Sequence, residues 1–219
     1  MAGTSDLRDY WAAYAVSFSA QEDDLSQWRA YAQGVGGFAI GCELKRPHLM
    51  RSIFEGSESS DPWMLFKVVY DKDTQRQSFE YVIKGIVDIF RSKRQNIQNH
   101  FLANLINKLC QRTRLLLADC LLSFKNPAFQ KEKEWRLVFL GDKAFRQSDM
   151  SVVNYRNTQF GLIPYVEYKT PTLDNLLPIG VVIQGSRVEP KLSAEAVQGY
   201  LIRYGYTYAN VRQTAVRLR

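Results

Sequence analysis

The stretch SFEYVIKGIVDIF, residues 78–90, decides the fold class because its apolar side chains repeat at helical spacing. Intervals of three and four residues place such side chains on one face of a helix, and they occur here at Phe79, Val82, Ile83, Ile86 and Phe90. The same spacing returns further along, up to Leu121. The sequence therefore predicts two long helices over about residues 74–124, ended by Lys-Asn-Pro, since proline disfavours a helical residue before it.

The segments on both sides of this helical block have the composition of strands, because aromatic and β-branched residues dominate them. The expected strands are residues 10–19, 38–44, 63–71, 133–141, 160–169, 177–185 and about 209–216. Two short helices are also expected. The first covers residues 25–33 and is preceded by a Ser-x-x-Glu capping box that starts at Ser19. The second covers residues 193–205, with Ser193 as its cap and Gly205 as its stop.

This order of elements predicts an α+β fold, with a mixed or antiparallel sheet core, a two-helix insertion at about 74–124 and a short C-terminal helix. The chain has 219 residues, which suits one domain, so we expect residues 1–219 to form a single domain. No apolar run approaches the ~18 residues that span a bilayer. The first residues also lack the pattern of a signal peptide, and we expect a cytoplasmic protein.

Cysteine, histidine and charge content narrow the classes of function. Three scattered cysteines, Cys42, Cys110 and Cys120, indicate free thiols in a reducing compartment rather than a disulfide framework. With only two histidines to join them, no metal site is expected. The net charge of +7 permits binding to phosphates. Its densest basic clusters, residues 91–95 and 110–114, lie in the helical block, where a solvated helix face is the commoner explanation and nucleic-acid binding the less favoured one.

The strand expected at 133–141 carries the strongest candidate for chemistry. Side chains alternate between the faces of a strand, so Glu132, Glu134 and Arg136 are expected to share one face. The other face, which we expect to be the buried one, carries Trp135, Leu137 and Phe139. Two carboxylates so close repel each other, and an adjacent guanidinium offsets that repulsion. A solvated face with an internal ion pair is the commoner case; the functional alternative is a carboxylate held rigidly to stabilise a developing positive charge.

A second candidate region begins at the end of the first strand. Ser17 and Ser19 are expected to share a face there and could hydrogen-bond a ligand, although Ser19 is also expected to cap the next helix. Neither histidine is placed to activate a serine, so nucleophilic catalysis is discounted. On the short helix, Trp28 is expected to pack on the sheet. Arg29 and Tyr31 are expected to reach a ligand at the rim of the sheet.

Six motifs in order along the chain resemble a bacterial family, the domain of unknown function 2971 (DUF2971) family. They are SFS (17–19), DDLSQWRAY (23–31), GGFAIG (36–41), NPAFQKEKEWRLV (126–138), GLIPYVE (161–167) and PIGVVIQG (178–185). The Trp-Arg pair and the Glu-x-Glu-Trp-Arg motif are the most specific. Relatives usually carry a preceding segment with an aromatic-His-aromatic-Thr strand. The resemblance implies that this segment is missing here, since Met1 falls just before the Ser-x-Ser strand.

The order of these motifs is also similar to that of ADP-ribosyltransferases, which act on nicotinamide adenine dinucleotide (NAD). That resemblance implies a catalytic Glu134, with Glu132 facing the acceptor. It further implies that Ser17 and Ser19 brace the nicotinamide ribose, and that the pyrophosphate meets a guanidinium of Arg29 or Arg136. Such a protein would serve as a toxin or phage-defence effector. The alternative is a non-catalytic binding or regulatory module in which the same motifs are structural.

Overall fold

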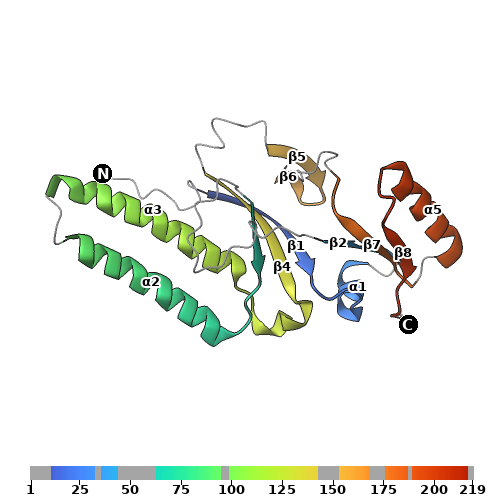
Figure 1. Ribbon diagram of the computed structural model, residues 1–219, viewed down its shortest axis with the longest axis horizontal. Coiled ribbons are helices and arrows are strands. Elements are labelled where there is room, and N and C mark those ends of the chain that lie inside the picture. The colour runs from blue at the N-terminus through green and yellow to red at the C-terminus, as the bar shows by residue number, and fades with distance from the viewer. Residues whose placement is uncertain are drawn as a thin grey trace. The chain divides into compact units, whose positions relative to one another are not determined.

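The computed structural model (Figure 1) describes residues 11–32, 36–43, 63–94, 99–142, 153–167, 176–186 and 189–216. They form an α+β fold, as predicted, with several small sheets. The chain divides into two compact units. The first comprises Met1–Phe18 and His48–Phe145, and the second comprises Ser19–Pro47 and Arg146–Arg219. Each unit is considered by itself, and one domain over residues 1–219 stays a prediction. Among the described residues, no helix combines the length and apolarity required to cross a membrane.

The first unit combines a three-stranded sheet with two long helices. The sheet has the order β1-β4-β3, and β3 and β4 are antiparallel. Its elements are β1 (Trp11–Ser19), β3 (Trp63–Lys67), α2 (Lys72–Arg94), α3 (Asn99–Ser123), the 3₁₀ helix η3 (Pro127–Glu132) and β4 (Glu134–Asp142). Figure 1 shows α2 and α3 lying side by side over most of their length. The two-helix insertion is therefore confirmed.

Helix α2 begins two residues before the predicted start because Asp71 caps it. The Asp71 carboxylate accepts hydrogen bonds from the backbone N–H of Thr74 at 2.7 Å and from its hydroxyl at 2.6 Å. These bonds satisfy groups that lack a partner in the first turn of a helix. The side-chain amide of Gln75 donates to the carbonyls of Val69 (2.6 Å) and Lys125 (2.9 Å). The start of α2 is thus fastened to the segment that follows α3.

Strand β4 is buried on both faces, which differs from the prediction of one buried and one solvated face. Val138 packs with Met64 and Phe66, and Leu122 of α3 packs against this cluster. On the opposite face the ring of Phe139 lies 5.1 Å from that of Trp63. The face that carries Glu134 and Arg136 is therefore the one that α3 covers, because residues 134, 136 and 138 alternate onto the same side.

The second unit contains a three-stranded sheet, a separate hairpin and two helices. Its elements are α1 (Leu25–Tyr31), β2 (Phe38–Cys42), β5 (Val153–Thr158), β6 (Gly161–Val166), β7 (Ile179–Gln184), α5 (Pro190–Arg203) and β8 (Asn210–Gln213). The sheet order is β2-β7-β8, in which β2 is antiparallel and β8 parallel to β7. A parallel pair requires a crossover connection, and α5 supplies it. Strands β5 and β6 form the hairpin.

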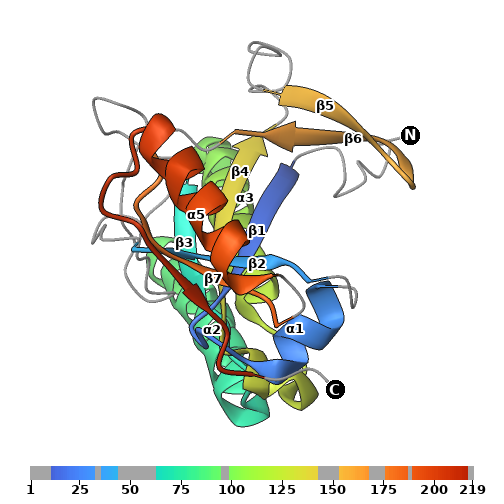
Figure 2. The same ribbon diagram turned by 90° about the vertical axis from the view of Figure 1, so that its right-hand side faces the viewer.

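Helix α5 covers one face of the sheet in the second unit, and Trp28 of α1 lies near the end of β7. Val182 of β7 packs with Leu201 of α5 and with Ala209, and Figure 2 shows α5 lying against this sheet. A side chain added at Gly185 would meet the Trp28 ring at 3.4 Å. Trp28 is 6% exposed, which confirms that it packs on the sheet.

Two helix caps differ from the predicted ones. Asp24, rather than Ser19, caps α1, since its carboxylate accepts from the backbone N–H groups of Ser26 and Gln27. The Ser19 hydroxyl instead bonds the backbone of Gln21. Likewise α5 begins at Pro190 with Glu189 as its cap, and not at Ser193. At α1 a carboxylate nearer the helix takes the place of the expected serine, whereas α5 starts earlier than expected, so that Ser193 lies within the helix.

Asp23 holds the C-terminal segment of the second unit. Its Oδ1 accepts hydrogen bonds from the Trp28 indole (2.6 Å) and from the Thr214 hydroxyl (2.5 Å). Its Oδ2 accepts from the backbone N–H of Ala215 at 2.8 Å. Burial raises the pKa of Asp23, but the bonds from Thr214 and Trp28 outweigh it, so the pKa lies below its ordinary value. The ionised carboxylate therefore joins residues that are nearly two hundred positions apart.

Candidate functional site

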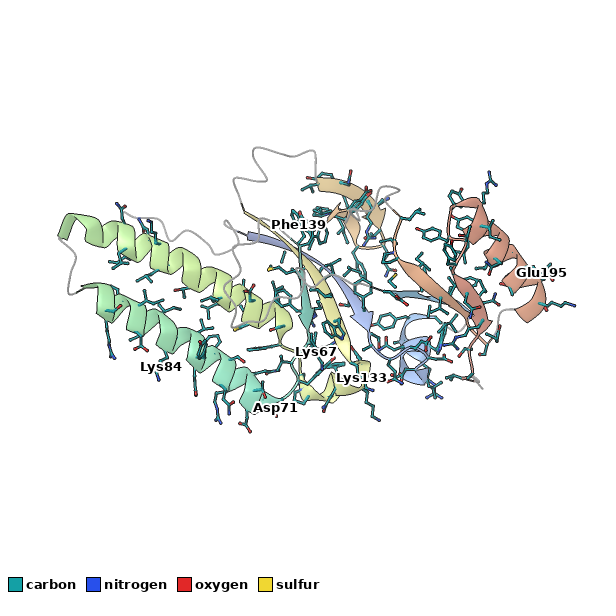
Figure 3. The ribbon with its side chains drawn as sticks, viewed as in Figure 1. Lys67, Asp71, Lys84, Lys133, Phe139 and Glu195 are labelled. Atoms are coloured by element: carbon teal, nitrogen blue, oxygen red, sulfur yellow. The ribbon has the colours of Figure 1, made fainter. Side chains whose placement is uncertain are left out.

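The candidate site lies in the first unit, where η3 turns into β4. Asn126 caps η3, with its side-chain oxygen accepting from the backbone N–H of Ala128 at 2.9 Å. Lys133, labelled in Figure 3, then adopts a left-handed conformation with φ 45° and starts the strand in a new direction. Glu132 therefore ends the 3₁₀ helix and is not on the strand. The prediction that it shares a strand face with Glu134 is wrong for this reason.

Glu134 is a buried carboxylate whose two oxygens each accept two hydrogen bonds. Oε1 accepts from the Ser17 hydroxyl at 2.6 Å and from Arg136 Nε at 2.8 Å. Oε2 accepts from Lys125 Nζ at 2.7 Å and from Arg136 Nη2 at 3.3 Å. The residue is only 5% exposed, whereas Ser17 is exposed. Lys125 and Glu132 are also partly exposed, with side-chain exposures of 23% and 22%, so solvent reaches the edge of this arrangement but not Glu134 itself.

Lys125 joins both glutamates. Its ammonium lies 2.5 Å from Glu132 Oε2 and 2.7 Å from Glu134 Oε2. The backbone fixes this position, because Lys125 N–H donates to the carbonyl of Val69 at 3.2 Å just after α3 ends. Sequence alone does not reveal this role, because Lys125 is expected only at the end of a helix. Glu132 and Glu134 thus do come together, through a lysine rather than through strand alternation.

Arg136 uses three of its nitrogens inside the protein. Besides its two bonds to Glu134, it donates from Nη1 to the carbonyl of Leu122 at 2.6 Å. Leu122 lies in the last turn of α3, whose carbonyls have no partner within the helix. Arg136 therefore caps a free carbonyl at the C-terminal end of α3 and also neutralises the charge of Glu134. The backbone N–H of Glu134 in turn donates to the hydroxyl of Tyr70 at 2.9 Å, a second partner that the sequence did not suggest.

The charge state of Glu134 limits its chemistry. Burial raises the pKa of Glu134, but hydrogen bonds from Arg136, Lys125 and Ser17 outweigh burial and lower it from 4.5 to about 2. Burial lowers the pKa of Lys125, but the hydrogen bonds to Glu132 and Glu134 outweigh burial, so the pKa lies above its ordinary value. At neutral pH the two carboxylates and two cations of this group balance. Glu134 is then a fixed negative charge, and it is too weakly basic to take up or deliver protons.

The structure groups part of the predicted site. Ser17 and Arg136 both contact Glu134, and Glu132 joins them through Lys125. We call these residues the Glu134 cluster: Ser17, Lys125, Glu132, Glu134 and Arg136. The remaining predicted ligands of the cofactor, Ser19, Arg29 and Tyr31, belong to the second unit. Arg29 is exposed, and Tyr31 is 73% exposed. A site that includes both sets stays a prediction.

The fold and the cluster define an α+β protein that holds a serine-bound, charge-compensated glutamate on a covered strand. A family model described as "Protein of unknown function (DUF2971)" matches residues 27–137, just over half of the 219 residues. The chain belongs to the DUF2971 family. The matched region contains Trp28, Lys125, Glu132, Glu134 and Arg136. No curated protein and no solved structure matches the chain.

Proposed function

We propose that this chain is an ADP-ribosyltransferase-like protein that acts on NAD, as a bacterial effector in a toxin or phage-defence context. One observation supports the proposal above all. The Ser17 hydroxyl of β1 donates to the Glu134 carboxylate of β4 at 2.6 Å, and these two strands are neighbours in one sheet. A serine strand paired with a glutamate strand is the arrangement that the resemblance to ADP-ribosyltransferases implies.

The proposed role of Glu134 is electrostatic. ADP-ribosyl transfer breaks the bond between nicotinamide and C1′ of its ribose, the electron pair leaves with nicotinamide, and a nucleophile of the acceptor bonds to C1′. Positive charge develops on the sugar as that bond breaks, and a preorganised negative group stabilises it. A pKa of about 2 keeps Glu134 ionised for this purpose at neutral pH. Ser17 and Arg136 fix the orientation of the carboxylate, and Glu132 is assigned to the acceptor side.

The polar groups of the Glu134 cluster fit the ribose of the dinucleotide and not its pyrophosphate. A carboxylate and a hydroxyl suit the ribose, because both accept hydrogen bonds from its hydroxyl groups. A pyrophosphate instead requires cations. Arg136 and Lys125 already neutralise Glu134 and Glu132, so they do not fit that role. Arg29, in the second unit, stays a prediction for the pyrophosphate.

A second candidate function rests on a different observation, the hydrogen-bond balance of Glu134. Four donor atoms surround its two oxygens, and the group carries no net charge. A buried carboxylate satisfied in this way can serve structure alone, by fastening β4 to β1 and to the end of α3. The family motif would then mark a non-catalytic binding or regulatory module.

NAD labelled on its adenylate, incubated with the purified chain and cell extract, distinguishes the two functions. The proposal expects label on macromolecules together with free nicotinamide. Glu134→Gln should lower both rates by roughly 10²–10³-fold, the scale for losing one preorganised group. Ser17→Ala, which removes the hydroxyl of an exposed residue and no charge, should also slow label transfer and nicotinamide release. Glu80→Gln, at a carboxylate side chain that is 70% exposed on α2, is the matched control and should not.

Two results would contradict the enzyme. One is a wild-type chain that neither transfers label nor releases nicotinamide. The other is a Glu134→Gln variant that is as active as the wild type. If Ser17→Ala and Glu134→Gln change only the free energy of unfolding, the structural role of the cluster is the correct one. Thermal unfolding of each variant is measured alongside, so that loss of activity is separated from loss of fold.

A further inference from the structure

Helix α2 carries an apolar ridge that the described part of the chain leaves uncovered. Phe79 is 41% exposed, Ile83 42% and Val87 38%. These residues recur every fourth position, so they lie along one side of the helix. We call them the α2 ridge. The buried side of α2 is formed by other residues, among them Ser78 and Val82, each 3% exposed. The ridge is therefore surplus to the packing of the first unit.

A row of charged residues runs beside the ridge. Its members alternate in sign at four-residue intervals: Arg76, Glu80, Lys84 and Asp88. All four are exposed, and Figure 3 shows Lys84 pointing away from α3. Arg76 contacts Asp73 at 2.9 Å and Glu80 at 4.0 Å within the helix. Apart from these contacts, the row presents a plus-minus-plus-minus pattern to whatever lies on the ridge.

This pattern complements itself when it is reversed. Read in the opposite direction, the row becomes minus-plus-minus-plus. In an antiparallel pair of α2 helices, a two-fold axis at the level of Val82 would place Phe79 between the partner's Ile83 and the partner's Val87. It would also set Glu80 beside the partner's Lys84 and Arg76 beside the partner's Asp88. The same surface would serve both copies, and a two-fold contact of this kind closes after two subunits.

We propose that the α2 ridge is the contact between two copies of this chain, which pair through antiparallel α2 helices. The apolar ridge supplies the buried centre of the contact and the alternating charges supply its rim, which is the usual division at protein interfaces. The charged rim also fixes the direction of pairing, because opposite charges meet only when the helices are antiparallel and centred at the level of Val82.

Sedimentation equilibrium over a range of protein concentrations tests the existence of the dimer. The wild type should reach twice the chain mass of 25.3 kDa. Ile83→Glu should remain a monomer, because the two-fold axis would bring both new carboxylates together. The matched control is Ile106→Glu, the same residue type at the same 42% exposure but on α3, and it should still dimerise. Circular dichroism checks that each variant keeps its helices.

A charge exchange tests the direction of pairing. Glu80→Lys turns two attractive contacts into repulsive ones and should raise the dimer dissociation constant about tenfold, on the scale of exposed ion pairs. Adding Lys84→Glu restores the complementary row and should return the constant to about the wild-type value. A wild-type monomer at every concentration would overturn the proposal. So would a dimer lost through Ile106→Glu as readily as through Ile83→Glu, or a double variant no tighter than Glu80→Lys.

Discussion

At the scale of single residues, Glu134 shows what it takes to keep a charge inside this protein. An ion that leaves water loses several kcal/mol of solvation, so it must be compensated by close opposite charges and hydrogen bonds. Lys125 and Arg136 supply the charges, and Ser17 supplies a further bond. Removing any one partner leaves the others buried with an imbalance. This is why the Glu134 cluster should act as a unit.

The free energy of unfolding should therefore depend on acid through Glu134. Its pKa in the folded chain is about 2, below the ordinary 4.5, so the folded state holds the proton more weakly than the unfolded state. The stabilisation is complete above pH 4.5 and is lost as the pH falls towards 2, by up to about 3 kcal/mol. Urea unfolding at a series of pH values measures the slope. In the Glu134→Gln variant the free energy of unfolding should change less with pH over this interval. A slope equal to that of the wild type would contradict the assignment of the acid dependence to Glu134.

Gln184 is a buried polar residue whose side-chain amide makes no hydrogen bond in the described part of the chain. It is 1% exposed, and neither its side-chain nitrogen nor its oxygen has a hydrogen-bond partner in the described part of the chain. Unpartnered buried polar groups cost about 1–3 kcal/mol. Gln184→Met, which keeps the length of the side chain, should raise the free energy of unfolding by about 1 kcal/mol.

The neighbouring glutamine provides the control for this prediction. Gln213 pairs with Gln184 in register on β8, and its side-chain nitrogen donates to the carbonyl of Gly185 at 2.9 Å, while its side-chain oxygen has no hydrogen-bond partner in the described part of the chain. Gln213→Met should therefore give a smaller gain than Gln184→Met, because it also removes a bond that is made. Chemical unfolding compares the two variants. A loss of stability in Gln184→Met would show that the amide has a partner such as a bound water molecule.

At the scale of elements, sequence period predicted the helices and most strands, whereas contacts between elements set the details. The spacing around Ile83 was enough for α2, since a 23-residue helix repeats its pattern many times. Strand β5, Val153–Thr158, was not anticipated because its polar residues lack apolar alternation and it exists as the partner of β6. The covered face of Glu134 was missed because strand alternation does not reveal that α3 packs over it.

The caps were misassigned for a related reason. Ser19, Asp23 and Asp24 all precede α1, and the sequence does not fix which of them is nearest to the first turn. Asp24→Ala should lower the free energy of unfolding by about 1 kcal/mol, because it removes the bonds to the backbone of Ser26 and Gln27. Ser19→Ala, which leaves these bonds intact, should change it by less than about half as much. Thermal melts of both variants decide between the two caps. Equal losses of stability in the two variants would contradict the assignment of Asp24 as the cap of α1.

At the scale of the whole molecule, the two units interrupt each other in sequence. Residues 48–145 of the first unit lie between the two segments of the second. Asp23 belongs to the earlier of these segments, and its partners Thr214 and Ala215 belong to the later one. Two hydrogen bonds on one carboxylate therefore join parts of the second unit that local sequence cannot bring together.

Replacing Asp23 tests how much this junction contributes. Asp23→Ala should lower the free energy of unfolding by about 2 kcal/mol, since hydrogen bonds to a charged acceptor are worth about 1.5–3 kcal/mol each and some water replaces them. The indole of Trp28 loses a partner at the same time, so its fluorescence should shift towards that of a solvated ring. Glu22→Ala, at an adjacent carboxylate that is 61% exposed and pairs with Arg212, is the control. An equal loss in both variants would contradict the junction.

The same interleaving governs the order in which the chain can fold as it is made. Asp23 leaves the ribosome 191 residues before Thr214, whose hydroxyl donates to its carboxylate. Strand β2 must likewise wait for β7. During translation the earlier segment of the second unit therefore lacks these contacts until β7 and residues 214 and 215 have been made.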